Sequence, residues 1–104
     1  MDIVYASLDR RPAAGQASEG EVAEVIDVLW AHATPEDRLE HAGGHAEPDR
    51  IDLMLFLRTS DNPDDGGAER RAAALLHRSH LGSPLLRHRY LPPLPVPAEA
   101  HPAT

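Results

Sequence analysis

Residues 50–57 read RIDLMLFL, and this is the most apolar run in the chain. A short apolar run of this length predicts a β-strand, and here both of its faces carry apolar side chains. One face would hold Ile51, Leu53, Leu55 and Leu57. The other would hold Asp52, Met54 and Phe56. A strand that is apolar on both faces is typical of a central position covered on two sides. The rest of the chain must therefore provide neighbouring strands and covering helices.

Two further elements precede this run. Asp2–Leu8 is rich in β-branched and aromatic residues and predicts a strand. A helix is predicted to begin at Ser18, where Ser18 and Glu21 have the spacing of a capping box. Apolar residues then recur three and four positions apart, as in an amphipathic helix. They are Val22, Val25, Ile26, Leu29, Trp30 and Ala33.

Helix signals also flank the central run. Residues 34–37 read TPED, which predicts a short helix to about His41, ended by Gly43 and Gly44. After the turn-rich residues 61–67, a second long helix is predicted from about Ala68 to His80. Its inward positions would be Ala72, Leu75, Leu76 and Ser79. Ser83 and Pro84 would open a helical turn or an irregular link.

This order predicts an α/β fold, with α+β as the alternative class. We expect a small βαβ-based sandwich with parallel strands, in which helices pack on two or three strands per chain. A third strand would come from about residues 88–91, or a second chain would pair edge to edge, because two strands make a weak sheet. A ferredoxin-like arrangement completed by dimerisation would satisfy this. Residues 1–97 would form a single domain and 98–104 a flexible tail, with the proline-rich stretch before the tail packed on the domain.

Composition narrows the possible functions. The chain of 104 residues has no cysteine, which excludes disulfides and thiolate sites. Neither a signal peptide nor a membrane span is predicted, so we expect a cytoplasmic protein. All ten basic residues are arginine, as in a GC-rich bacterial genome. No phosphate-binding or nucleophile motif occurs. We therefore predict no cofactor and favour a protein that is not an enzyme.

Charge is distributed unevenly along the chain. The net charge is −7, but residues 70–90 contain five arginines, three histidines and no acid. This strip predicts a contact surface for an acidic partner. Its candidate partner-binding residues are Arg70, Arg71, Arg78, Arg87, Arg89 and Tyr90. The alternative interpretations are an ordinary solvated face and a nucleic-acid-binding module, and the overall acidity argues against the latter.

Histidines and one strand carboxylate support a rival hypothesis. His41 with His45, and His77 with His80, could ligate a metal ion with carboxylate support. Asp52 could lie buried with a raised pKa and act as a general base, or it could simply pair with Arg50. Because histidine is common in this composition, we predict no metal site. The favoured function is a non-catalytic accessory protein, a homodimer that binds a protein or peptide partner in a bacterial enzyme or biosynthetic system.

Overall fold

The computed structural model describes residues 1–62 and 66–93. Its strands are β1 (Asp2–Asp9), β2 (Leu39–Glu47) and β3 (Arg50–Leu57). Its helices are α1 (Glu19–His32), α2 (Gly67–Gly82) and α3 (Pro84–Arg89), with 3-10 turns η1 (Pro12–Ala14) and η2 (Pro35–Asp37). The predicted tail at 98–104 and most of the proline-rich stretch before it lie outside the described residues.

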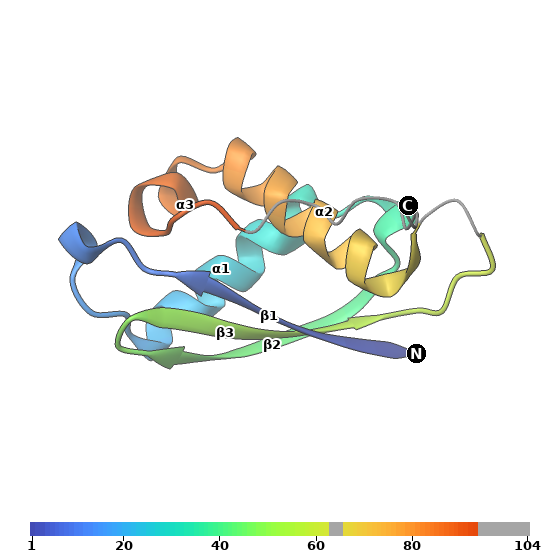
Figure 1. The fold of residues 1–104 in the computed structure, drawn as a ribbon, viewed down its shortest axis with the longest axis horizontal. Helices are drawn as coiled ribbons and strands as arrows, with labels where there is room; N and C mark the ends of the chain where they lie inside the picture. Colours follow the sequence, from blue (N-terminus) through green and yellow to red (C-terminus); the bar gives the residue numbers. More distant parts are fainter. Residues whose placement is uncertain (63–65, 94–104) are drawn as a thin grey trace, which may run out of the picture.

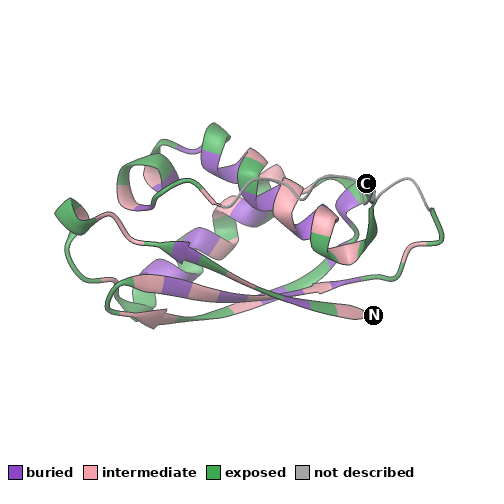
Figure 2. Ribbon diagram, in the orientation of Figure 1, coloured by how far each residue is buried: buried purple, intermediate pink, exposed green. Residues whose placement is uncertain are grey.

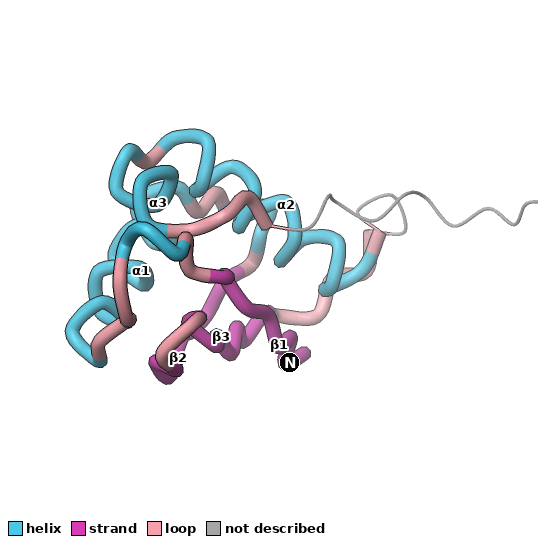
Figure 3. Tube along the Cα trace, turned by 60° about the vertical axis from the view of Figure 1, so that its left-hand side comes forward, coloured by secondary structure: helices cyan, strands magenta, loops and turns pink. Residues whose placement is uncertain are grey.

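The three strands form one antiparallel sheet in the order β1-β3-β2. Helices α1 and α2 pack on one face of this sheet, which confirms the α/β class (Figure 1; Figure 3). Because β1 and β2 both run antiparallel to β3, they run parallel to each other, and α1 crosses over between them. This is the element order of a ferredoxin-like fold up to its second helix. The final strand of that fold is not among the described elements.

The central position predicted for β3 is confirmed, whereas the predicted pairing is wrong. A simple βαβ unit would place two parallel strands together, but β1 pairs with β3 in the antiparallel sense from Asp2↔Leu57 to Asp9↔Arg50. The missing element is β2, which forms a hairpin with β3 and lies on its other side. A hairpin joins antiparallel strands through a tight turn, so β2 pairs with β3 without a crossover connection.

The short helix predicted to His41 is also wrong. Its start is correct, because η2 begins at Pro35 and the Thr34 N–H donates to the Asp37 carboxylate over 2.7 Å. Arg38 then adopts a left-handed conformation with φ of 59°, which ends the turn, and β2 begins at Leu39. The glycines 43 and 44 lie within this strand instead of ending a helix.

Residues 88–91 do not supply the third strand. They make one isolated antiparallel bridge, Arg10↔Tyr90, directly after β1. The Leu91 N–H donates to the Asp9 carbonyl and the Arg11 N–H to the Arg89 carbonyl, each over 2.8 Å. The chain that follows α3 is therefore tied to the end of β1.

The core lies between the helices and the covered face of the sheet (Figure 2). All four predicted inward residues of α2 are buried. In α1 the predicted stripe holds at Val22, Val25 and Leu29, whereas Trp30 is 45% exposed. The Ser18–Glu21 capping box does not form. Glu21 instead turns inward, and its carboxylate contacts Arg10 and Tyr90.

Gly44 allows α1 to approach the sheet closely. A Cβ added there would lie 2.8 Å from the Asp52 carbonyl oxygen and 3.1 Å from side-chain atoms of Val22 and Leu53. At Gly43 nothing lies within 4 Å of such a Cβ. The Asp52 backbone carbonyl cannot move away from a Cβ at position 44 without disturbing the β2–β3 pairing. The neighbouring glycines therefore differ sharply in the room that they leave.

We expect Gly44→Ala to lower the free energy of unfolding by about 1–3 kcal/mol, the usual cost of overpacking. Gly43→Ala should change it by less than about 0.5 kcal/mol, as for other surface substitutions. Urea denaturation followed by circular dichroism measures both values. Equal stability of the two variants would contradict this account of the close approach.

Candidate functional site

Two of the predicted partner-binding arginines tie α2 to η2. Arg78 binds the buried Asp37 carboxylate through two hydrogen bonds of 2.9 and 3.0 Å, and donates to the His32 carbonyl over 3.0 Å. Arg71 is buried and donates to the backbone carbonyls of Asp37 and Arg58. These guanidinium groups hold the ends of α1, η2 and β3 against α2.

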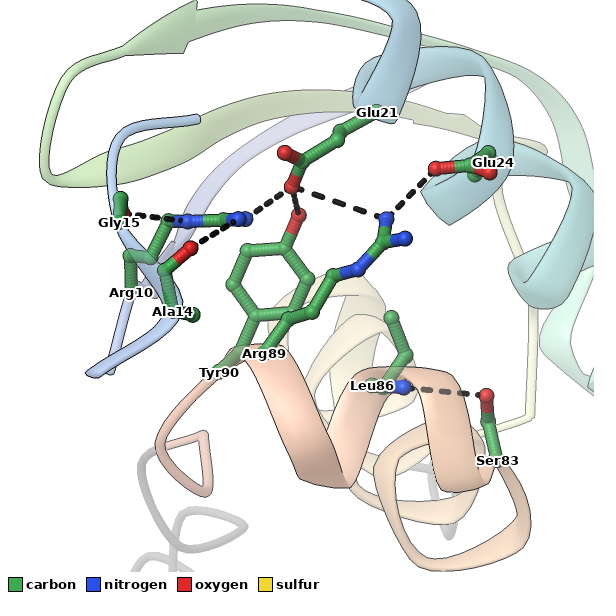
Figure 4. Close-up of polar contacts among 9 residues, drawn as sticks. All are labelled: Arg10, Ala14, Gly15, Glu21, Glu24, Ser83, Leu86, Arg89 and Tyr90. Atoms are coloured by element: carbon green, nitrogen blue, oxygen red, sulfur yellow. Dashed lines mark hydrogen bonds and ion pairs between the residues drawn. The ribbon is translucent and has the colours of Figure 1, made fainter. Parts of the chain in front are cut away.

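Two more residues of the predicted set lie around Glu21 (Figure 4). Tyr90 is fully buried, and its hydroxyl donates to Glu21 Oε1 over 2.8 Å. Arg10 also binds Glu21, and Arg89 donates to Glu24 over 2.6 Å. Burial raises the pKa of the Tyr90 hydroxyl, and the neighbouring Glu21 carboxylate raises it further. This cluster fixes the segment after α3 to α1 and to the end of β1.

The remaining two residues lie nearer the surface. Arg87 is exposed and donates to the Leu81 carbonyl, and Arg70 is half-buried. The set therefore does not form one continuous exposed strip, since Arg71 and Tyr90 are buried inside the fold. Partner binding by Arg70, Arg78, Arg87 and Arg89 remains a prediction.

The structure does not bring the two histidine pairs together. His41 and His45 both lie on β2, about 13 Å apart along the strand by its rise per residue. His80 is buried in α2, with Nε2 3.0 Å from the Tyr90 carbonyl oxygen, whereas His77 is exposed. Across residues 1–62 and 66–93, no group of three or more potential ligands is placed to hold a metal ion.

The sheet face opposite the helices carries four rows of residues, with one residue from each strand in every row. We call this surface the open sheet face. The register places Phe56 between Ile3 and His41, and Met54 between Tyr5 and Gly43. The third row has Asp52 between Ser7 and His45, and the fourth has Arg50 between Asp9 and Glu47. In the views of Figures 1 and 3, the helices lie on the other side of the sheet.

The third row is polar, and its Asp52 carboxylate forms an ion pair with Arg50. Asp52 Oδ1 accepts hydrogen bonds from Arg50 Nε and from Ser7 Oγ, both over 2.8 Å. The Arg50 guanidinium, followed by the Ser7 hydroxyl, lowers the pKa of Asp52. The raised pKa considered from the sequence is thus wrong, because this carboxylate is partly exposed and paired with Arg50. A carboxylate with a lowered pKa is a weak general base.

No nucleophile and base pair forms in this row. The Ser7 hydroxyl donates to Asp52 and so has no imidazole to accept its proton. His45 instead contacts two carboxylates, Glu47 at 2.9 Å and Glu19 at 3.3 Å. These groups make a surface network of polar contacts, without the arrangement of nucleophile, base and orienting group that acyl transfer requires.

The first two rows form an apolar patch of Ile3, Tyr5, Met54 and Phe56. Tyr5 is 75% exposed and Ile3 48% exposed, and the His41 ring lies 5.3 Å from the Phe56 ring. We expected cover on this face, and the elements described here leave it open. The sequence of β1 indicates this patch, because Ile3 and Tyr5 alternate along the strand with Val4 and Leu8, which face the core.

The chain has no match among protein-family models, curated proteins or solved structures. Within the described part of the chain, no helix has the length and apolar character needed to cross a membrane.

Alkaline pH tests the Tyr90 cluster. The folded-state pKa of Tyr90 lies above the unfolded value of about 10, so its contribution is intact below pH 10 and is lost as pH rises further. We expect the free energy of unfolding to fall by up to about 1.4 kcal/mol per pH unit above pH 10. The chain has no lysine or cysteine to mask this slope. Tyr90→Phe should remove it, measured by urea denaturation at pH 9, 10 and 11. A wild-type protein with no slope would refute the argument.

Loss of the Asp37 carboxylate should destabilise the fold. Asp37→Ala leaves the Arg78 guanidinium without its two-point partner, and we expect a cost of about 3 kcal/mol, at the upper end for hydrogen bonds to charged groups. Glu36→Ala, at the exposed neighbouring position, should cost less than about 0.5 kcal/mol. Thermal and urea denaturation compare the two variants. Similar costs for both would show that Asp37 is no anchor.

Proposed function

We propose that this protein is a non-catalytic accessory protein, a homodimer that binds a protein partner through the open sheet face. The observation that carries the proposal is the apolar patch of Ile3, Tyr5, Met54 and Phe56, on a face that no helix of residues 1–62 and 66–93 covers. A contiguous apolar patch at the surface of a small domain marks an interaction site. The proposed setting is the bacterial cytoplasm, on the composition argument above.

The chemistry around the patch supports binding over catalysis. Ser7, Asp52 and His45 occupy the adjoining row, and each is held by a hydrogen bond or ion pair to a neighbour. Such groups suit the polar rim of an interface, which surrounds an apolar centre. The exposed aromatic ring of Tyr5 is the type of side chain that contributes most to binding energy.

Charge indicates the kind of partner. The chain carries −7 overall, and Glu40 on β2 and Asp9 on β1 are exposed acids at the edges of the sheet. A partner with an apolar surface and a basic rim would complement this arrangement. Neither the metal-dependent enzyme nor the nucleic-acid module gains support from the geometry of the described residues.

The test compares two exposed aromatic positions. Tagged wild-type protein and the variants Tyr5→Ser and Trp30→Ser are used to capture partners from the native cell, and the captured partner is identified and purified. Trp30 is 45% exposed on α1, away from the open sheet face, and serves as the matched control. We expect Tyr5→Ser to weaken binding of the purified partner about tenfold or more. Trp30→Ser should bind like the wild type.

Two results would contradict the proposal. One is equal binding of the partner by the Tyr5→Ser and wild-type proteins. The other is recovery of this chain alone, without a second protein. Because Tyr5 is mostly exposed, Tyr5→Ser should unfold within about 0.5 kcal/mol of the wild type, so a loss of binding is not a loss of fold.

A further inference from the structure

The outer edge of β1 presents backbone groups that have no partner among the described residues. Asp9 directs its carbonyl away from β3, since that oxygen accepts from the Leu91 N–H. Backbone direction alternates along an antiparallel ladder, so the N–H and C=O groups of Ile3, Tyr5 and Ser7 point outward as well. No backbone hydrogen bond reaches them from any described residue.

The chain's own C-terminal segment is a poor candidate for this edge. It pairs with the end of β1 through Arg89 and Leu91. The next residues of the same parity are prolines at 93, 95 and 97, and proline has no N–H to donate to a ladder. A hollow of about 560 Å³ lies beside β1, between Tyr5 and Ser7 on one side and Pro92 and Pro93 on the other.

The two edges of the sheet differ in how they resist pairing. The outer strand β2 has a register shift between Leu39 and His41 and carries Glu40 and Glu47. Irregular geometry and charge are common protection for an edge. By contrast, β1 pairs with β3 in unbroken register from Asp2 to Asp9 and carries its two exposed apolar side chains, Ile3 and Tyr5, on the open sheet face.

We propose that β1 pairs antiparallel with β1 of a second copy, with Ile3 of each copy opposite Tyr5 of the other. This inference rests on the homodimer proposed above and names its interface. Each Ile3–Tyr5 pair would exchange both of its N–H···O bonds. The two sheets would join into one, and the apolar patches of both copies would become continuous.

The acidic side chains at the ends of β1 and the free space beside this strand favour this register. With Val4 on the two-fold axis, Asp2 lies opposite Ala6, so the acidic side chains at the strand ends stay apart. Like charges directly opposite each other would destabilise a parallel pairing. The register also ends at Ser7 and leaves Asp9 to its bond with Leu91. The hollow beside Tyr5 and Ser7 provides room for the incoming strand.

Amide hydrogen exchange of the full wild-type chain, read residue by residue by NMR, tests the pairing. In a monomer the N–H groups of Val4 and Ala6 are protected by β3, and those of Ile3 and Tyr5 are open to solvent. We expect exchange at Ile3 and Tyr5 to slow about tenfold or more between ~10 μM and ~1 mM protein, by mass action. Unchanged exchange at these two residues would overturn the inference.

Backbone and side-chain variants at one position separate the interface from the partner site. Tyr5→Pro removes the outward N–H without touching the β1–β3 ladder, whereas Tyr5→Ser keeps that N–H and removes the ring. Analytical ultracentrifugation should give twice the 11.3 kDa monomer mass for the wild type and Tyr5→Ser, and the monomer mass for Tyr5→Pro. Protected Val4 and Ala6 amides would show that Tyr5→Pro is folded.

The outcomes distinguish this inference from the proposed function. A folded Tyr5→Pro protein that still dimerises would overturn the β1 interface and leave the dimer intact. A wild-type monomer at ~1 mM would overturn the dimer, while partner capture that depends on the Tyr5 ring would stand. Protection of Ile3 and Tyr5 only after the purified partner is added would assign the edge to that partner and overturn pairing with a second copy.

Discussion

The structure depends on a sheet that the helices among the described residues cover on one face only. The central strand β3 is apolar on both faces, and its inward side chains Ile51, Leu53, Leu55 and Leu57 are at most 2% exposed beneath α1 and α2. A two-layer arrangement of this kind leaves the second face to solvent or to another protein. Met54 and Phe56 lie on that second face, beside Ile3 and Tyr5 of β1. The binding role proposed above rests on this arrangement of layers.

Two buried carboxylates hold the ends of the α1 layer in place. Glu21, in the first turns of α1, accepts from Tyr90 and Arg10, and Asp37, just after α1, accepts from Arg78 through two bonds. A planar guanidinium can bind a carboxylate at two points, which a lysine ammonium cannot do. Arginines that resemble a basic strip in the sequence are in large part internal ties. Carboxylates from distant segments pair with Arg78 and Arg89, so part of the positive charge of residues 70–90 is neutralised in the fold.

Local patterns predicted the elements well and their pairing poorly. The strands at 2–8 and 50–57, the start of α1 and the inward face of α2 follow from periodicity and are confirmed. β2 was missed because LEHAGGHAE has neither alternation nor β-branched residues, and only its pairing with β3 and the approach of Val22 over Gly44 make it a strand. Asp52 was correctly linked to Arg50 as one alternative. The burial of Tyr90 and Arg71 depends on contacts across the fold, which spacing along the chain cannot reveal.

The bridge between Arg10 and Tyr90 has a consequence for synthesis on the ribosome. It joins the end of β1 to the segment after α3, so these contacts form only when residues 89–91 have emerged. Before that, β1 has no strand to pair with until β3 has emerged, and its end stays open until residues 89–91 follow. Contacts so distant along the chain slow folding, and nascent strands with open edges are prone to aggregate. In a growing chain of this protein, β1 therefore stays unpaired for longer than either of the other two strands.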